Sequence, residues 1–327
     1  MASDALDPAL GERLHTTIRD LYPICRSITG DGVRQTLRYV ADRIPIRVHE
    51  VPTDTPVLDW TVPREWNIQR AWIKDPDGKT VVDFADHNLH VVNYSVPVHE
   101  RMSLEDLRPH LHSLPDQPQA IPYRTSYYVE NWGFCLPHER LEALPDGEYE
   151  VFIDSTLEAG HLTYGELVLP GRVEDEILFT THVCHPSLCN DNLSGIAISI
   201  ELAKALAQSE RHYTYRFLYM PGTIGSITWL ARNQDAAGRI AHGLVVSNLG
   251  DTGNFHYKCT PSSDRPIDGC VVRALGRLGH DVQIEPFSPF GYDERQYCSP
   301  GFDLPIGSLT RTPWGRYPQY HTSGDDS

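Results

Sequence analysis

The spacing of apolar residues predicts two amphipathic helices followed by a strand at the start of the chain. Residues 10–21 and 33–44 carry apolar side chains three or four positions apart, which is the repeat of a helix with one buried face. Pro23 follows the first of these segments, and proline is common just after a helix end. Residues 46–51 alternate apolar and polar side chains as a strand does. We expect these elements to be scaffold.

From residue 148 onward, strand patterns and helix patterns follow one another. Residues 148–153 and 162–169 alternate in the way that paired antiparallel strands do. Further strands are expected at 177–181, 215–220, 241–249 and 303–309, with helices at 196–207, from about 224, and at 268–278. This order is typical of an α/β fold with a mixed, largely parallel sheet flanked by helices.

The stretch between residues 52 and 147 has a different character. Prolines and aromatic residues are frequent, turns recur and the predicted strands are short, while residues 104–114 and 138–144 have helical patterns. We therefore expect two domains. Residues 1–51 and 148–327 would form the α/β domain, and residues 52–147 an inserted, smaller β-rich domain.

Composition narrows the range of partners. The 327 residues include 40% hydrophobic ones, enough for a sizeable core, and the net charge of -16 argues against nucleic acid and anionic membrane surfaces as partners. No run approaches the roughly 20 apolar residues of a membrane span, and the N-terminus has no apolar signal core. Seven scattered cysteines indicate free thiols. We expect a cytoplasmic protein, with a homo-oligomer left open.

Metal-ligand chemistry is concentrated in residues 176–195, EILFTTHVCHPSLCNDNLSG. A predicted strand ends here and delivers two histidines, two cysteines and an aspartate within ten residues, at the strand end where open α/β sheets bind ligands. His182 or His185, together with Asp191, offers the nitrogen and oxygen ligands that zinc accepts.

Two other interpretations of this loop compete. The histidines could satisfy a buried loop while Asp191 or Asn192 caps the following helix, but capping explains a single aspartate and not the whole cluster. A structural zinc on His182, Cys184, His185 and Cys189 would need a second ligand pair at finger-like spacing, which the sequence lacks.

This loop resembles that of the zinc aminopeptidases, which carry His-x-Asp after a strand and a second aspartate inside Asp-Asn-x-Ser-Gly. By position, His182 matches the family's metal histidine and Asp191 its bridging aspartate, whereas Cys184 stands where the family has the aspartate that orients the histidine. The string THVCHPSLCNDNLSG is closer still to bacterial "aminopeptidase-like domain" proteins, in which a domain of unknown function is inserted into the peptidase fold. His185 belongs to the Cys-His-Pro of that subgroup, so either histidine could be the ligand.

The resemblance implies further ligands and one missing group. Asp251, after a predicted strand, matches an aspartate of the family, although an aspartate in a glycine-rich turn is an equally good interpretation. His321, in Tyr-His-Thr, matches the terminal metal histidine. The family has Glu-Glu where this chain has Gly222 and Thr223, the first glutamate being the general base and the second a ligand of the other metal.

Asp293 and Glu294 are the nearest candidates to replace the base, with a solvated charge cluster as the alternative. We therefore expect one or two zinc ions and metal-dependent hydrolysis of an amide or peptide bond in a small substrate. Two other functions stay open: a binding protein that kept the metal and lost catalysis, and a hydrolase that uses Cys184 as nucleophile.

Overall fold

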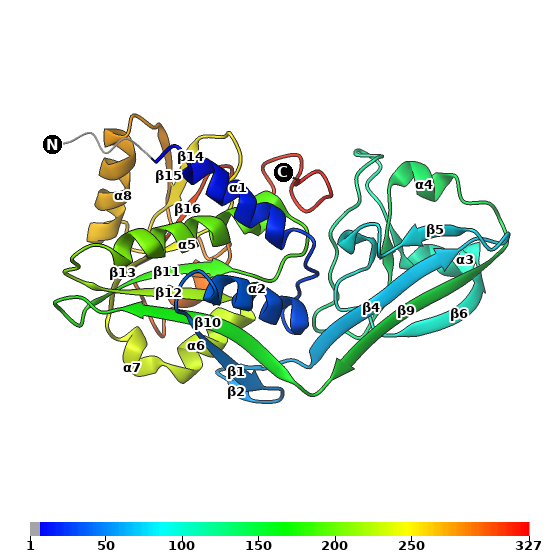
Figure 1. Cartoon of the computed structure of the whole chain (residues 1–327), viewed down its shortest axis with the longest axis horizontal. Helices are drawn as coiled ribbons and strands as arrows, with labels where there is room; N and C mark the ends of the chain where they lie inside the picture. The colour runs from blue at the N-terminus through cyan, green and yellow to red at the C-terminus, as the bar shows by residue number, and fades with distance from the viewer. Residues whose placement is uncertain (1–6, 327) are drawn as a thin grey trace.

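A computed structural model describes residues 7–326 and is built around two main β-sheets, beside which lie two short two-stranded ones (Figure 1). The larger sheet has eight strands in the order β1-β10-β12-β11-β13-β16-β14-β15. These are β1 (Arg47–Pro52), β10 (His161–Leu169), β12 (Thr214–Met220), β11 (Glu176–His182), β13 (Ile240–Val246), β16 (Ile306–Thr310), β14 (Phe255–Lys258) and β15 (Val282–Glu285). The pairs β12-β11, β11-β13, β13-β16 and β14-β15 are parallel and the others antiparallel. The expected mixed, largely parallel sheet is confirmed.

Helices cover both faces of the larger sheet. On one face, apolar side chains of α1 (Leu10–Leu21), α2 (Asp31–Ala41) and α5 (Ser194–Ala207) pack with Phe217 and Tyr219 of β12. On the other face, α6 (Ile224–Arg232) and α9 (Glu294–Tyr297) contribute to a core that includes Leu178 and Ile306. Two more helices in this part of the chain are α7 (Gln234–Ala237) and α8 (Pro266–Arg277). The central strands are therefore buried on both sides, as their nearly continuous apolar sequences require.

The smaller sheet has four strands, in the order β5-β4-β9-β6. They are β5 (Thr80–Asp83), β4 (Glu65–Lys74), β9 (Glu148–Glu158) and β6 (Val98–Ser103). The antiparallel strands expected at 148–153 and 162–169 are confirmed as β9 and β10. They do not pair with each other, because β9 pairs with β4 and β6 while β10 pairs with β1 and β12. The division of the chain into residues 1–51 with 148–327 and an insertion of 52–147 stays a prediction.

Short elements complete this second part of the chain. They are β2 (Pro56–Val57), β3 (Trp60–Thr61), β7 (Leu111–His112), β8 (Phe134–Cys135), α3 (Leu104–Leu107), α4 (His138–Glu142) and the 3₁₀ turns Asn88–His90 and Arg108–His110. The helix expected over 104–114 is wrong, since α3 gives way to a 3₁₀ turn and a strand. Pro109 accounts for the break, because its ring clashes with the preceding helical turn and it has no N–H to donate.

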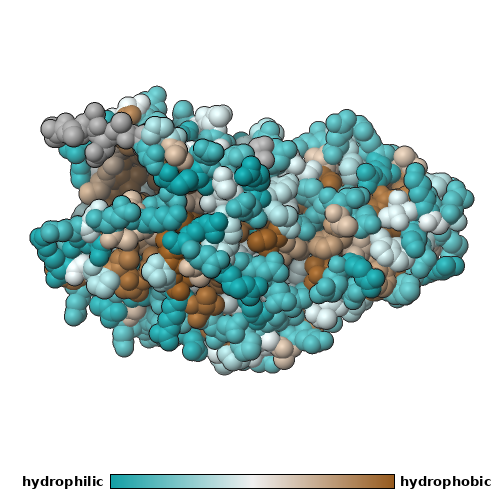
Figure 2. Space-filling model, in the orientation of Figure 1, coloured by the Kyte–Doolittle hydropathy of each residue, from teal (hydrophilic) through white to brown (hydrophobic). Residues whose placement is uncertain are grey.

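The visible surface is largely hydrophilic, with hydrophobic residues gathered in separate patches (Figure 2). Among the helices of residues 7–326, none is long and apolar enough to span a bilayer.

Candidate metal centre

The candidate site begins where β11 ends. His182 is the last residue of this strand, which lies between two parallel neighbours, β12 and β13. At such an edge the side chains leave the packed layer and can meet residues from neighbouring loops. The chain then passes through a loop and an irregular helical turn (Cys189–Leu193) into α5. This turn carries Asp191 back toward His182.

Four of the predicted side chains converge here. Nε2 of His182 lies 2.8 Å from Oδ1 of Asp191, and Nε2 of His321 lies 3.0 Å from its Oδ2. Ligand atoms of His182, His185 and Asp191 all lie within 4.8 Å of one another. The imidazole of His185 is 4.8 Å from that of His182 and 5.3 Å from that of His321, measured between ring centroids. Both histidines of the His182/His185 alternative therefore face the same point.

Burial and mutual contact set the protonation states of this cluster. Burial by itself would raise the pKa of Asp191, but the neighbouring His185, His182 and His321 hold it well below its usual value, so the carboxylate is ionised. Burial lowers the pKa of His185 well below 6.5, which keeps this imidazole neutral. Ionised carboxylate and neutral imidazole are the forms that bind a metal ion.

The donor set fits zinc. Up to three imidazoles and one carboxylate, gathered from a strand end, a loop and the C-terminal segment, match the nitrogen and oxygen ligands of catalytic zinc sites. Three of the four residues are nearly inaccessible, His182 and Asp191 being 1% exposed and His185 7% exposed. The side chain of His321 is 31% exposed, so solvent reaches the cluster on that side.

Asp251 lies outside this group of ligand atoms. Its carboxylate accepts hydrogen bonds from the Asn190 side chain, from the N–H of Gly253, and from the N–H and hydroxyl of Thr312, at distances of 2.6–3.1 Å. Both oxygens are therefore used within the protein. Asp251 is therefore not one of the converging groups, and its side chain instead holds Asn190, the residue before Asp191.

Asp325, which the sequence analysis did not select, also supports the turn that carries Asp191. The carboxylate of Asp325 accepts hydrogen bonds from the N–H groups of Asn190 and Asp191, at 2.6 and 3.0 Å. Asp325 is 3% exposed, and burial raises its pKa to about 6 against the effect of these two bonds. In the sequence, the one indication that Asp325 lies near the site is its position four residues after His321, in His-Thr-Ser-Gly-Asp.

The two candidate bases differ in their surroundings. Glu294 is buried, forms an ion pair with Lys258 and accepts a hydrogen bond from the N–H of Tyr292. Asp293 is also buried, and its Oδ1 accepts a hydrogen bond from Ser226 at 2.8 Å, whereas Oδ2 has no partner among the described residues. Burial raises the pKa of Asp293 to about 7. Asp293 is the better candidate for accepting a proton.

An aromatic ring packs against Gly222, the residue that the sequence resemblance places where zinc aminopeptidases have their general base. Gly222 carries no side chain, and a Cβ placed on it would collide with the ring of Tyr292. The Tyr292 hydroxyl donates to the Gly222 carbonyl at 3.1 Å, and its ring centroid lies 4.5 Å from that of His182. Burial raises the pKa of Tyr292 well above 10, so this group is a neutral phenol. It cannot act as a carboxylate base.

Cys184 is buried beside the same ring. Its sulfur lies 3.4 Å from the Tyr292 hydroxyl and 3.4 Å from Nδ1 of His185. Burial raises the pKa of this thiol to about 12. Because the thiolate is the nucleophilic form, these surroundings do not favour a cysteine hydrolase.

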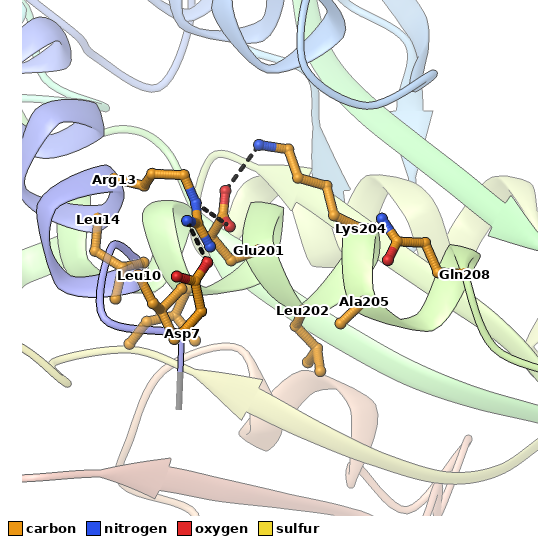
Figure 3. A pocket seen from close by; sticks show the side chains of 10 residues that line it. Asp7, Leu10, Arg13, Leu14, Glu201, Leu202, Lys204, Ala205 and Gln208 are labelled. Carbon is orange, nitrogen blue, oxygen red and sulfur yellow. Dashed lines mark hydrogen bonds and ion pairs between the residues drawn. The ribbon is translucent and has the colours of Figure 1, made fainter. Parts of the chain in front are cut away.

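A cavity of about 600 Å³ lies elsewhere, between α1 and α5 (Figure 3). Arg13 bridges Asp7 and Glu201 there, and Glu201 also pairs with Lys204. Its charged side chains are therefore paired with one another and do not form a cluster of metal ligands, in contrast to the loop after β11.

Comparison with known proteins identifies the family of this chain. A family model described as "Domain of unknown function (DUF4910)" matches residues 15–327. The chain is 51% identical over 316 residues to a Clostridium acetobutylicum protein whose name describes a polysaccharide biosynthesis protein with an aminopeptidase-like domain. That match covers 97% of this chain and 73% of the relative.

Two crystal structures extend the comparison. One, described as a peptidase from Clostridium acetobutylicum, superposes with a TM-score of 0.95 at 50% identity, covering 97% of this chain and 75% of that one. The other, BSAP, a zinc aminopeptidase from Bacillus subtilis, superposes with a TM-score of 0.68 at 13% identity, covering 96% and 88%, which shows the fold alone. The chain belongs to the DUF4910 family, and its α/β fold is that of the aminopeptidases.

Proposed function

We propose that this protein is a zinc-dependent hydrolase of an amide or peptide bond in a small substrate. The observation that carries the proposal is the convergence of His182, His185 and His321 on the ionised carboxylate of Asp191, at the carboxyl edge of parallel strands. A zinc ion held there would act as a Lewis acid that polarises the scissile carbonyl and lowers the pKa of water.

The protein's own residues would supply binding, orientation and proton transfer. Asp191 anchors two imidazoles, and Asp325 and Asp251 hold the turn that presents it. We assign the role of proton acceptor to Asp293 and not to Glu294, because Glu294 forms an ion pair with Lys258. A pKa of about 7 suits Asp293 to general base catalysis near neutral pH.

A second candidate function is that of a metal-retaining binding protein. Tyr292 against Gly222 favours it, because the phenol occupies the space that a carboxylate base would need. In this case the site would bind an amide or peptide without cleaving it.

Turnover separates the two functions. We would assay the purified chain against a panel of aminoacyl and acyl-amino-acid amides, with zinc supplied and with a chelator. Asp191→Ala, His321→Ala and Asp293→Asn should each abolish hydrolysis. His256→Ala and Asp303→Ala are matched controls, since both residues lie outside the cluster and Asp303 pairs with Arg265 at the surface.

The outcomes differ for each function. Zinc-dependent hydrolysis that Asp191→Ala removes and the controls retain supports the enzyme. Zinc binding without turnover of any panel member favours the binding protein. Hydrolysis that survives both the chelator and Asp191→Ala contradicts the metal mechanism.

A further inference from the structure

The peptide that carries His321 is held by a segment nearly 200 residues earlier in the chain. Residues 121–123 and 321–323 lie antiparallel, with a β-bridge between Pro122 and Thr322. Three hydrogen bonds join them: Tyr123 N–H to the His321 carbonyl at 2.7 Å, Ser323 N–H to the Ile121 carbonyl at 2.8 Å, and Ile121 N–H to the Ser323 hydroxyl at 3.0 Å. Figure 1 shows this C-terminal loop, in red, beside the part of the chain built on the smaller sheet.

His321 needs such support. Its φ of +55° lies in the left-handed region, which residues other than glycine enter at a cost in free energy. The N–H of Tyr123 donates a hydrogen bond to the carbonyl of His321, while the imidazole of His321 contacts Asp191. The backbone conformation that directs the ligand is thus stabilised by residues 121–123.

The ring of Tyr123 packs against two imidazoles of the cluster. Its centroid lies 5.0 Å from that of His321, edge to face, and 5.2 Å from that of His185. The side chain is fixed in turn, because its hydroxyl bonds that of Tyr127 at 2.5 Å and the residue is buried. Tyr123 therefore limits the rotation of both imidazoles.

The same stretch of chain also contacts the loop after β11. Leu188 packs into a small apolar cluster with Leu89, Val92, Ile121, Tyr123 and Cys135. The side chain of Asn88 donates to the Ser187 hydroxyl at 2.8 Å. Residues 88–92 and 121–123 thus touch both ligand-bearing segments, the one that follows His182 and the one that contains His321.

We propose that Tyr123 is a positioning residue for the metal centre, and that residues 88–92 and 121–123 complete this centre by holding its two ligand-bearing segments together. The proposal rests on the proposed zinc site and adds to it a requirement on residues that are not ligands. Partners that orient metal ligands typically change metal affinity by 10–100-fold when they are replaced.

The test compares zinc affinity in variants of the full chain, by competition with a chromophoric chelator. Tyr123→Leu removes the ring that faces His185 and His321, and Tyr123→Phe removes only the hydroxyl. Tyr94→Leu is the matched control: Tyr94 is also buried and also contacts Tyr127, and its ring pairs in the described part of the chain are with Trp66 and Tyr127, not with an imidazole.

We expect Tyr123→Leu to weaken zinc binding about 10–100-fold, with Tyr123→Phe and Tyr94→Leu within about threefold of the wild type. Cobalt substituted for zinc should show an altered visible spectrum in Tyr123→Leu only. Equal losses in Tyr123→Leu and Tyr94→Leu, or no loss in either, would overturn the proposal.

A Ser323→Ala variant and the zinc affinity of the wild type separate failure of this inference from failure of the zinc site. If Tyr123→Leu does not fold, Ser323→Ala removes the acceptor of the Ile121 N–H without touching a ligand, and unchanged zinc affinity in that variant refutes the positioning role. Absence of zinc binding in the wild type would refute the metal site itself, and this inference with it. Zinc binding in the wild type with no effect of any of these variants would refute the inference alone.

Discussion

The contact between Gly222 and Tyr292 gives a prediction that can be worked out from the structure. An added Cβ on Gly222 would overlap the ring of Tyr292, including Cζ and the hydroxyl oxygen, which are held by the hydrogen bond to the Gly222 carbonyl. Gly222 is not among the glycines with positive φ, so no left-handed backbone conformation adds to the cost of the clash with the ring.

Gly222→Ala should therefore destabilise the protein by about 1–3 kcal/mol, the usual cost of overpacking. Tyr292→Ala, although destabilising by itself, removes the obstacle. In that background we expect Gly222→Ala to change the free energy of unfolding by less than about 0.5 kcal/mol, the usual range for a substitution that meets no obstacle.

Urea denaturation of the wild type, both single variants and the double variant measures the coupling between the two positions. Gly301→Ala is the control, because nothing lies within 4 Å of a Cβ added there. A coupling free energy near zero would refute the packing of Tyr292 on Gly222, and with it our explanation for the glycine where the resemblance to zinc aminopeptidases predicts a glutamate.

Three shorter predictions concern Cys184, Asp325 and Glu65. Cys184→Ser should leave any hydrolytic activity within a few-fold of the wild type, because burial keeps the thiol protonated, with a pKa of about 12; loss of activity with folding intact would revive the cysteine mechanism. Asp325→Asn should weaken zinc binding about tenfold in the chelator assay, since one carboxylate oxygen that accepts an N–H becomes an amide nitrogen. The hydrogen bonds from Arg34 lower the pKa of Glu65 from 4.5 to about 2, so this pair stabilises the fold above pH 4.5 and loses its effect as pH falls toward 2. Glu65→Gln should accordingly cost about 1–2 kcal/mol at pH 7 after solvent screening and almost nothing near pH 2, and a cost independent of pH in denaturation experiments would contradict the assignment.

The convergence of His182, His185 and Asp191 could be predicted from the sequence because these residues are close together in it. His182, His185 and Asp191 lie within ten residues, and the strand before them and the helix after them have clear apolar patterns. His321 was found through its Tyr-His-Thr setting, which the resemblance supplied.

Other features depend on contacts between distant residues, which no local pattern encodes. Glu294 pairs with Lys258, 36 positions earlier, and this pairing separates it from its neighbour Asp293. The partners of Asp251 and the packing of Tyr292 on Gly222 likewise come from separate parts of the chain. Tyr123 lies in a stretch whose aromatic residues gave no sign of which one reaches the site.

The pairing of the strand that begins at Glu148 likewise could not be predicted from its own sequence. Its alternation was recognised, but alternation does not reveal the pairing partner, and the strand joins β4 and β6 in the smaller sheet. By contrast, the break of the expected helix at 104–114 could have been seen, since Pro109 stands in its middle.

The central claim is that His182, Asp191 and His321, with His185 beside them, hold zinc. Anomalous diffraction at the zinc absorption edge, from crystals of the wild type grown with zinc and of Asp191→Ala beside it, tests it most directly. We predict a peak about 2.0–2.2 Å from the imidazole nitrogens and from an Asp191 oxygen, absent in the variant. A wild-type crystal with no peak at these residues, or an equal peak in Asp191→Ala, would contradict the account.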